Sequence, residues 1–362
     1  MRTMKPKSVL LMLQPISLPR LEGIARYARE HCWNLVLEDR LFGNVRDWNG
    51  DGVLTTLRDR ADQKRAIRAF VRRGIPVVDL TVACPDVKVP RVVSDHAEIG
   101  RLAARHFRER GFDRLAWFSS GWSNVHRLRY DAYAAESGRR PDKWNLRNIR
   151  RKLETCRKPI GVLAFDEAEA ARVLNAAFRS GVSVPEEISI LGIGNDRFLC
   201  ESQSVTISSV DQNLVENAYS GAALLDRLMD GGRAPARPTL IPPRGIVPRA
   251  STDTLANDDP QVRQALIFIH SHLNRPFGAA EIAQALDIPR TRLDALFADK
   301  VGHSIGQEIL RQRILRVKRL LKDPSTPIKR IAALCGFCNS GYLTNVFRRE
   351  TGLTPKAWRR GH

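Results

Sequence analysis

Cys335 and Cys338 have the spacing of a redox-active dithiol. A redox C-x-x-C motif normally begins a helix that follows a strand. Here the motif lies between two segments with helical periodicity, residues 328–334 and 340–350. We therefore interpret Cys335 as a small core residue and Cys338 as incidental.

Elsewhere the sequence shows no spacing that is typical of a catalytic centre. The eight histidines are dispersed, with His106 and His126 interpreted as surface residues. The sequence has no phosphate-binding glycine loop and no nucleophile elbow. We predict that the protein is not an enzyme and that it has no catalytic residue, metal or cofactor.

Polar side chains instead follow several strand-like segments. Asp166 follows residues 160–165, and Asn195 and Asp196 follow residues 188–193. Ligands of open parallel sheets bind outside the carboxyl ends of the strands. Carboxylate and amide groups there can make paired hydrogen bonds to a polar ligand. These positions are therefore candidate ligand contacts.

Some of these candidates have a second interpretation. Asp166 and Asp95 each precede a helical segment, and Asp is a favoured N-cap, so either residue binds ligand or caps its helix. Trp122 can stack on the ring of a ligand or pack in the core. Residues 15–20 also follow a strand-like run and belong to the same candidate site.

The first 250 residues alternate between apolar strand-like runs and segments with helical spacing. Such alternation predicts an α/β architecture with parallel sheets. Strands are expected at 9–13, 35–37, 52–54, 76–80, 91–93, 115–118, 160–165 and 188–193. Helices are expected at 21–30, 61–73, 98–109, 130–137, 144–156 and 167–180.

A small, polar stretch follows and divides the chain. Residues 251–260 are predicted to be a linker between a domain at 5–250 and a domain at 261–362. The chain has a net charge of +20, and residues 261–362 contain 18 Lys+Arg against 7 Asp+Glu. This excess favours a phosphate-bearing partner such as double-stranded DNA, with a solvated basic face as the alternative.

The C-terminal domain is predicted to be all-α and contains two similar helix pairs. The first pair spans 279–286 and 290–300, and the second spans 328–334 and 340–350. Each has the helix, tight turn and helix of a helix-turn-helix unit. A long helix, 305–321, is expected to join the two units and to hold their recognition helices roughly 34 Å apart, one duplex turn.

The residues of this domain resemble the AraC family of transcriptional regulators. In the second unit the resemblance is carried by Ile331-Ala332, Cys335-Gly336-Phe337, Tyr342-Leu343, Phe347-Arg348-Arg349, Gly352, Thr354-Pro355 and Arg359. In the first unit it is carried by Ile282-Ala283, Leu286, Leu293, Phe297 and Gly302. It implies base-facing positions at Thr291, Asp294, Ala295, Ser340, Gly341 and Asn345.

Direct readout of bases is then expected to depend on Asn345, Asp294 and the flanking Arg290 and Arg292, because Ala295 and Gly341 have no polar side chain. A second group of basic residues is expected to bind phosphates or, alternatively, to be surface charge. This group is Arg348, Arg349, Arg330 and Lys329.

Residues 5–250 resemble the ligand-binding core of LacI-type regulators and periplasmic sugar-binding proteins. The resemblance is carried by residues 23–28, 100–115 and 181–196. It implies two α/β lobes with a ligand cleft between them, a sugar-binding arginine at Arg129 and a sugar-binding acid at Asn195 or Asp196. Such a core followed by an AraC-type domain is similar to the XylR-type regulators of xylose utilisation.

The sequence departs from that pattern in two places. Phe165 occupies a position where many relatives have an amide. The stretch from Arg129 to Asp166 is short, and the strand usual between its two helices is not evident, so we expect a shortened second lobe.

We expect a cytoplasmic, homodimeric, sugar-responsive regulator of transcription, with activation favoured by the resemblance and without a membrane segment. The alternative is a DNA-binding protein whose core binds another ligand, or none, and serves dimerisation.

Overall fold

The computed structural model describes residues 6–37, 48–254, 256–257, 259–321, 323 and 325–360. The chain divides into two compact units, residues 1–253 and 254–362. Four predicted boundary or linker positions, Lys5, Leu255, Asp258 and His362, lie outside the described residues.

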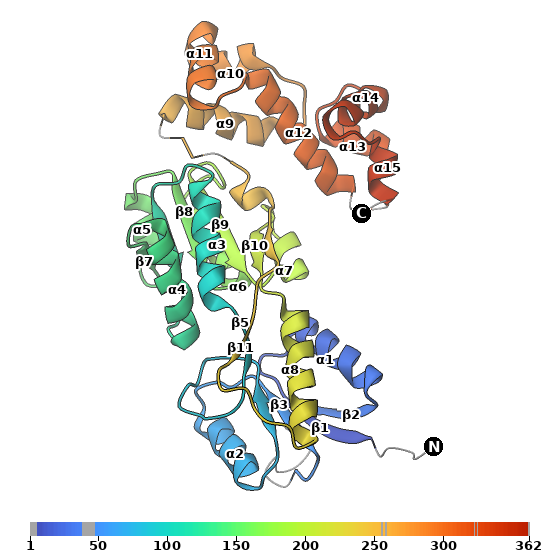
Figure 1. The fold of residues 1–362 in the computed structure, drawn as a ribbon. Helices are drawn as coiled ribbons and strands as arrows, with labels where there is room; N and C mark the ends of the chain where they lie inside the picture. Colours follow the sequence, from blue (N-terminus) through green and yellow to red (C-terminus); the bar gives the residue numbers. More distant parts are fainter. Residues whose placement is uncertain are drawn as a thin grey trace. The chain divides into compact units, whose positions relative to one another are not determined.

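The first lobe of the N-terminal unit has a parallel sheet in the order β2-β1-β3-β4 (Figure 1). Its inner strands β1 and β3 are apolar because both faces are covered; Val9 to Met12 of β1 are all buried, whereas the edge strand β2 is largely exposed. The strands are β1 (Lys7–Met12), β2 (Trp33–Leu37), β3 (Gly52–Thr55) and β4 (Val77–Asp79). The helices are α1 (Leu18–Glu30), α2 (Ala61–Arg72) and α8 (Leu214–Met229).

The second lobe has a six-stranded sheet in the order β12-β10-β9-β8-β6-β7, in which only β12 is antiparallel to its neighbour. Its strands are β6 (Leu115–Phe118), β7 (Asp142–Trp144), β8 (Ile160–Ala164), β9 (Ile188–Ile193), β10 (Ser208–Asp211) and β12 (Gly245–Val247). Its helices are α3 (His96–Arg108), α4 (Asn124–Ser137), α5 (Ile149–Thr155), α6 (Glu167–Arg179) and α7 (Arg197–Glu201). A separate parallel pair, β5 (Val92–Ser94) with β11 (Thr239–Ile241), completes the unit.

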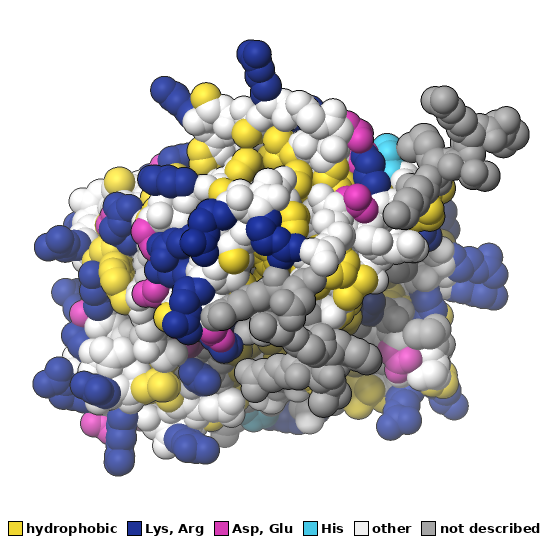
Figure 2. Space-filling model, turned by 90° about the horizontal axis from the view of Figure 1, so that it is seen from below, with side chains coloured by type: hydrophobic (Ala, Val, Ile, Leu, Met, Phe, Trp, Pro, Cys, Tyr) yellow, Lys and Arg dark blue, Asp and Glu magenta, His cyan; other side chains and the backbone are white. Residues whose placement is uncertain are grey.

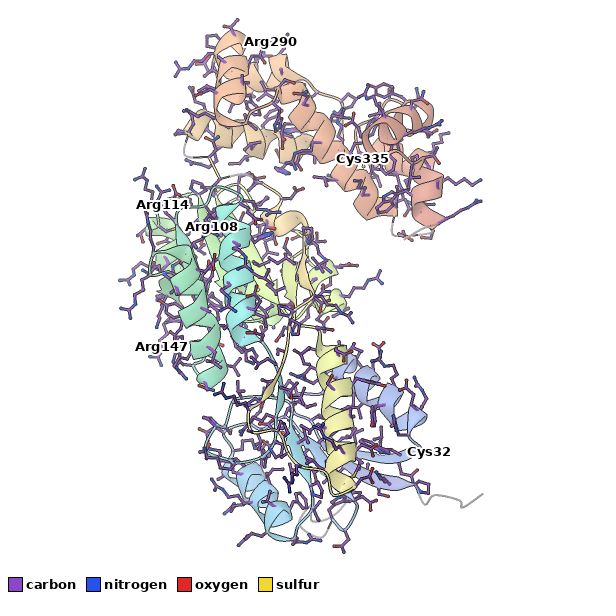
Figure 3. All side chains as sticks on the ribbon, in the orientation of Figure 1. Cys32, Arg108, Arg114, Arg147, Arg290 and Cys335 are labelled. Carbon is purple, nitrogen blue, oxygen red and sulfur yellow. The ribbon has the colours of Figure 1, made fainter. Side chains whose placement is uncertain are left out.

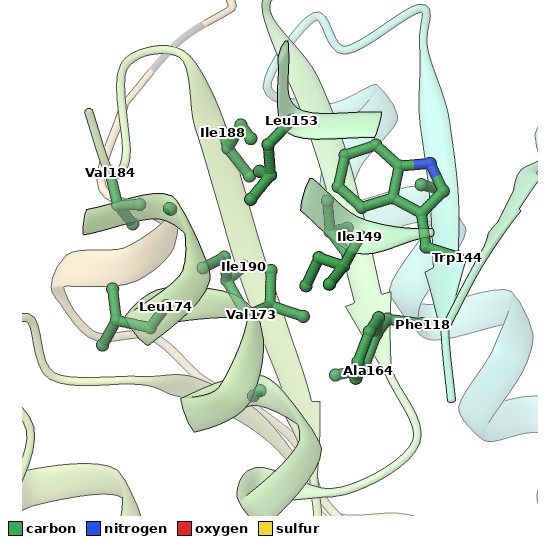
Figure 4. Packing of buried hydrophobic residues seen from close by; sticks show 14 of the residues in the cluster. Phe118, Trp144, Ile149, Leu153, Ala164, Val173, Leu174, Val184, Ile188 and Ile190 are labelled. Carbon is green, nitrogen blue, oxygen red and sulfur yellow. The ribbon is translucent and has the colours of Figure 1, made fainter. Parts of the chain in front are cut away.

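The expected absence of a strand between the two helices after Arg129 is wrong. β7 pairs in parallel with β6, and α5 begins only at Ile149, so the predicted helix 144–156 is a strand end, a turn and a short helix. The strand was missed because it lies at the sheet edge, where Asp142 and Lys143 are exposed. Trp144 is buried and packs into the core of this lobe (Figure 4).

The start of the predicted linker lies inside the sensor unit. Ser251 and Thr252 are buried, in a 3-10 turn at Ala250–Thr252. The Ser251 hydroxyl donates to the Ile190 carbonyl oxygen at 2.5 Å and accepts from the Ser208 amide at 2.9 Å. These two residues therefore belong to the second lobe.

The described C-terminal unit is all-helical, as expected. Its helices are α9 (Pro260–His272), α10 (Ala279–Ala285), α11 (Arg290–Lys300), α12 (Ile305–Leu321), α13 (Ile328–Leu334), α14 (Ser340–Thr351) and α15 (Pro355–Arg360). Two apolar cores form around opposite ends of α12, one including Leu293 and Phe297, the other Leu343 and Phe347. Cys335 is fully buried in the second core, as predicted.

Candidate effector cavity and DNA-binding surface

A cavity of about 570 Å³ in the N-terminal unit is lined by segments of both lobes. Its polar lining comes from loops that follow strands: Gln14 after β1, Thr56 after β3, Asp166 after β8 and Asp196 after β9. This is the edge at which open parallel sheets bind ligands. The volume is within the usual range for small-molecule sites, roughly 300–1,000 Å³.

Arg129 extends from α4 into this cavity and is only 4% exposed. It donates to the Phe165 carbonyl oxygen at 2.8 Å, to Gln212 Oε1 at 2.5 Å and toward His96 Nδ1 at 3.4 Å. Burial lowers the pKa of Arg129 to about 10, although Asp166 and Glu167 act to raise it. The guanidinium therefore remains charged at neutral pH and is held rigidly at the cavity wall.

Phe165, which stands where an amide was expected, forms an aromatic wall of the cavity. Its ring stacks on His126 with centroids 3.7 Å apart, and the Arg129 guanidinium lies over it. Burial lowers the pKa of His126 to about 4, with a further contribution from Arg129, so this imidazole is neutral at neutral pH. The prediction that His106 is a surface residue is wrong, because His106 is buried and lies 2.9 Å from the Thr252 hydroxyl, whereas His126 is half-buried in the cavity wall.

The candidate aspartates cap helices, and two of them also line the cavity. Asp166, Asp95 and Asp196 accept from the backbone amides of Glu169 (2.8 Å), Glu98 (2.9 Å) and Leu199 (3.0 Å). Asp95 is absent from the cavity wall, so the structure supports only its capping role. Asp166 and Asp196 retain a second carboxylate oxygen that no described hydrogen bond uses.

Asn195 and Trp122 do not line the cavity. Asn195 holds a turn with φ +60°, and its side-chain oxygen accepts from Arg249 at 3.0 Å. Trp122 is 54% exposed and packs against Tyr130, with the Lys143 ammonium 4.3 Å from its ring centroid. Neither side chain is placed for the ligand contact expected of it.

Arg20, His96 and Gln212 are among the cavity residues whose side chains were not singled out from the sequence. Arg20 belongs to the predicted segment 15–20, but the polar role of its side chain was not recognised. Gln212 follows β10, whose hydroxyl-rich sequence Ser208-Ser209-Val210-Asp211 carries little strand signal. His96 is the first residue of α3, directly after the Asp95 cap.

Nearly all of the predicted DNA-contacting side chains are exposed. Thr291, Arg292 and Asp294 are exposed on α11, and Arg290 projects from its first turn (Figure 3). Arg290 Nε lies 3.5 Å from Asp294 Oδ2, so two predicted base readers form an ion pair.

On α14, Asn345 and Arg348 are exposed, and Ser340 is half-buried in the first turn. The helix begins with Asn339, whose side chain accepts from the Tyr342 amide at 2.7 Å; this cap was missed in the sequence. Arg349 pairs with Glu350 at 3.0 Å. Lys329 and Arg330 are exposed on α13.

Arg313 of α12 joins the two helix-turn-helix units. It donates to the Arg275 carbonyl oxygen at 3.0 Å, and its guanidinium lies 5.3 Å from the Phe277 ring centroid and 5.9 Å from that of Phe337. Gly336 abuts the same carbonyl, since an added Cβ would lie 2.5 Å from it, and its φ is +67°. The close approach to this carbonyl and the positive φ explain why the turn of the second unit contains a glycine before Phe337.

Positive charge is not confined to these helices. In the view of Figure 2, many Lys and Arg side chains extend from the surface, with hydrophobic side chains between them. Net charge alone therefore does not locate the DNA-binding surface. The second helices of the two helix-turn-helix units, α11 and α14, are the elements that such a fold places in a major groove.

Among the described residues, no group of His, Cys, Asp or Glu is arranged to hold a metal ion. Within the same part of the chain, every helix is too short or too polar to cross a bilayer.

Comparison with known families identifies both units. Residues 104–252 match the periplasmic binding protein-like domain, and residues 282–361 match a helix-turn-helix domain. The chain is 27% identical to the xylose operon regulatory protein of Escherichia coli K12, over 94% of this chain and 92% of the relative. It is 26% identical to the protein of the same name from Haemophilus influenzae, over 94% of each chain.

Solved structures agree on the fold. A structure described as the xylose-binding transcription activator XylR matches with a TM-score of 0.81 and 23% identity, covering 99% of both chains. A LacI family regulator from Arthrobacter, in complex with lactose, matches with a TM-score of 0.57 and 22% identity over 69% of this chain and all of that one.

The chain thus combines a periplasmic binding protein-like domain with a helix-turn-helix domain, and the curated relatives that match it over 94% of its length are regulators of the xylose operon. Its two-domain architecture is similar to that of the XylR structure.

Proposed function

We propose that this protein is a sugar-responsive, sequence-specific regulator that acts as a homodimer in the cytoplasm and activates transcription. The observation that carries the proposal is the lined cavity at the strand ends, with Arg129 buried in its wall, in the same chain as two exposed recognition helices. The names of the relatives make xylose the first sugar to test and activation the first sign of regulation to test.

The proposed mechanism couples sugar binding to lobe closure. Ile16 and Leu18 line the cavity on the first lobe and are 59% and 78% exposed, so closure over a sugar would remove apolar surface from water. A ligand shifts an equilibrium only by its difference in affinity for the two states. A sugar that binds the closed lobes more tightly than the open lobes would therefore favour closure. It would also favour the arrangement of the two protomers that goes with the closed lobes.

The direct test has two measurements on the full chain. DNA ligands are first selected from a random duplex library, and their affinity is then measured by fluorescence anisotropy with and without a panel of pentoses and hexoses. We expect at least one sugar to change DNA affinity or the selected spacing of half-sites.

A second candidate function is a regulator whose core binds no ligand and serves only dimerisation. Phe165 favours this second function. It provides an aromatic ring where a polar ligand contact was expected, and His126 and Arg129 pack against that ring. A thermal-shift panel separates the two functions, because a ligand that binds only the folded state must raise the melting temperature. No shift with any small molecule, together with intact DNA binding, would favour the second.

A further inference from the structure

The charges around the effector cavity are unevenly compensated. Three guanidinium groups line it, those of Arg20, Arg58 and Arg129. In the part of the chain that the structure describes, none of the three has a carboxylate oxygen within 4.0 Å. Arg129 instead donates to neutral acceptors, and the Nε of Arg20 is buried without a hydrogen-bond partner.

The carboxylates of the same wall already have partners. Asp59 pairs with Lys64 at 2.7 Å, and Asp166 and Asp196 cap α6 and α7. Glu167 is buried and is turned toward β10, where it accepts from the Ser209 hydroxyl and, at 2.5 Å, from the Asn195 amide. The cavity therefore presents guanidinium groups without an ion-pair partner beside carboxylates that already accept hydrogen bonds or ion pairs, with one carboxylate oxygen each of Asp166 and Asp196 left over.

Arg20 and Arg129 also act on each other and on the residue between them. Burial lowers the pKa of each arginine to about 10, and the charge of Arg20 lowers that of Arg129 further. Burial and both arginines hold the pKa of His96 well below its ordinary value, so its neutral ring supplies no compensating charge. Asp79 acts on Arg20 only at longer range, because its carboxylate binds Arg91 at 3.1 Å.

A buried charge without a partner is costly, and a ligand that supplies the opposite charge removes that cost. Guanidinium groups match carboxylate and phosphate oxygens in a bidentate geometry. We propose that the effector of this protein is a monosaccharide derivative with an anionic group, a carboxylate or a phosphate, which binds between Arg20 and Arg129. This inference rests on the proposed function and names the chemical class of its effector.

The test is isothermal titration calorimetry on the full chain with four probes: D-xylose, its aldonic acid, a pentose 5-phosphate and inorganic phosphate. We expect one of the two sugar anions to bind at least about tenfold more tightly than D-xylose, since a hydrogen bond to a charged group is among the strongest single contacts. We also expect the affinity of that anion, but not of xylose, to fall as salt rises. Comparison of the aldonic acid with the pentose 5-phosphate shows whether the site prefers a carboxylate or a phosphate.

The variant Arg20→Gln should remove the advantage of the anion over xylose, a loss of about ten- to a hundredfold. Arg29→Gln is the matched control, because Arg29 is exposed on the same helix α1 and does not line the cavity. If Arg20→Gln unfolds the sensor, Arg20→Lys replaces it, because lysine keeps the positive charge but cannot make the bidentate contact with a carboxylate or phosphate.

The outcomes separate this inference from the proposed function. If xylose binds as tightly as both sugar anions, the anionic effector is wrong and the sugar sensor stands. Inorganic phosphate that binds as tightly as the pentose phosphate also overturns the inference, because the sugar then contributes nothing. If neither xylose nor either sugar anion binds, this inference fails, and the sensor function fails with it only when the full panel of pentoses and hexoses also leaves DNA affinity unchanged.

Discussion

The guanidinium carbon of Arg129 lies 4.8 Å from the centroid of the Phe165 ring, and the same side chain donates to the Phe165 carbonyl oxygen at 2.8 Å. Arg129 comes from α4 and Phe165 from the end of β8, so this contact ties a helix to the strand end that opens on the cavity. The charged group is thereby held in place before any ligand arrives, which reduces the entropy lost on binding.

Substitution of Arg129 should weaken effector binding without weakening DNA binding. Arg129→Gln removes a charged donor from the cavity, and we expect effector affinity to fall about ten- to a hundredfold while effector-free DNA affinity is retained. Calorimetry measures the effector affinity, and fluorescence anisotropy measures the DNA affinity without effector. Arg127→Gln on the same helix is the control, because Arg127 is largely exposed. Unchanged effector affinity in Arg129→Gln would exclude a ligand role for this residue.

The close packing of α3 on α4 predicts that the sensor is sensitive to a larger residue at Gly100. A Cβ at Gly100 would lie 2.4 Å from the Arg129 carbonyl oxygen. Gly100→Ala should therefore separate the helices and destabilise the sensor by roughly 1–3 kcal/mol. Chemical denaturation measures the loss, with Gly121→Ala as the control, since its nearest neighbour would be 4.0 Å away. Equal stability of the two variants would contradict this explanation.

The two kinds of residue on α14 should affect DNA binding differently. Asn345→Ala is expected to relax base preference at one position of the selected site, at a cost of about 1–3 kcal/mol. Arg348→Ala should weaken binding to all sequences and reduce the salt dependence by about one ion. Anisotropy on the selected site and its single-base variants, at several salt concentrations, separates the effects. A uniform loss for Asn345→Ala would exclude base readout by this residue.

The ion pair between Arg290 and Asp294 makes the role of Asp294 testable. If Asp294 only restrains Arg290, Asp294→Asn releases that guanidinium and removes a negative charge, so DNA affinity should rise a few-fold. Asp299→Asn is the control on the same helix, where Asp299 pairs with Lys300. Weaker binding by Asp294→Asn would instead show that the carboxylate accepts a hydrogen bond from a base.

Glu308 predicts an acid-dependent loss of stability in the C-terminal unit. It is 2% exposed; burial acts to raise its pKa, but hydrogen bonds and charge from Arg311, with Gln312 and His303, lower it to about 2. The folded state therefore favours the carboxylate form. This contributes roughly 3 kcal/mol above the unfolded pKa near 4.5, which is lost as the pH falls from there toward 2.

Glu308→Gln should lower stability at pH 7 and flatten that acid dependence. Hydrogen exchange of the α12 amides in the full chain, between pH 7 and pH 3, would measure both after correction for the intrinsic exchange rates. If the stability of the variant falls with pH as steeply as that of the parent, a group other than Glu308 causes the acid dependence.

Much of the fold was predictable because local pattern and burial agree. Continuous apolar runs such as Val9–Met12 identify strands covered on both faces, and the spacing of Leu343, Val346 and Phe347 identifies the inner face of a recognition helix. β7 was missed because an edge strand with two exposed polar residues carries almost no apolar signal. β10 was missed because its buried serines satisfy their hydroxyls through long-range bonds to Glu167 and Arg249.

The sequence by itself determined the two-domain architecture, the helix-turn-helix units and the strand ends where polar residues gather, because periodicity and turn chemistry are local. Tertiary structure alone decided which of these polar groups share one cavity. Asn195 and Trp122 follow the same kind of segments as Asp196 and Arg129, yet they lie outside the cavity wall. Arg20, His96, Arg129 and Gln212 are far apart in sequence and meet only because the two lobes align their strand ends. Charge compensation is likewise a property of distances in space, so the unpaired guanidiniums that point to an anionic effector were visible only in the folded chain.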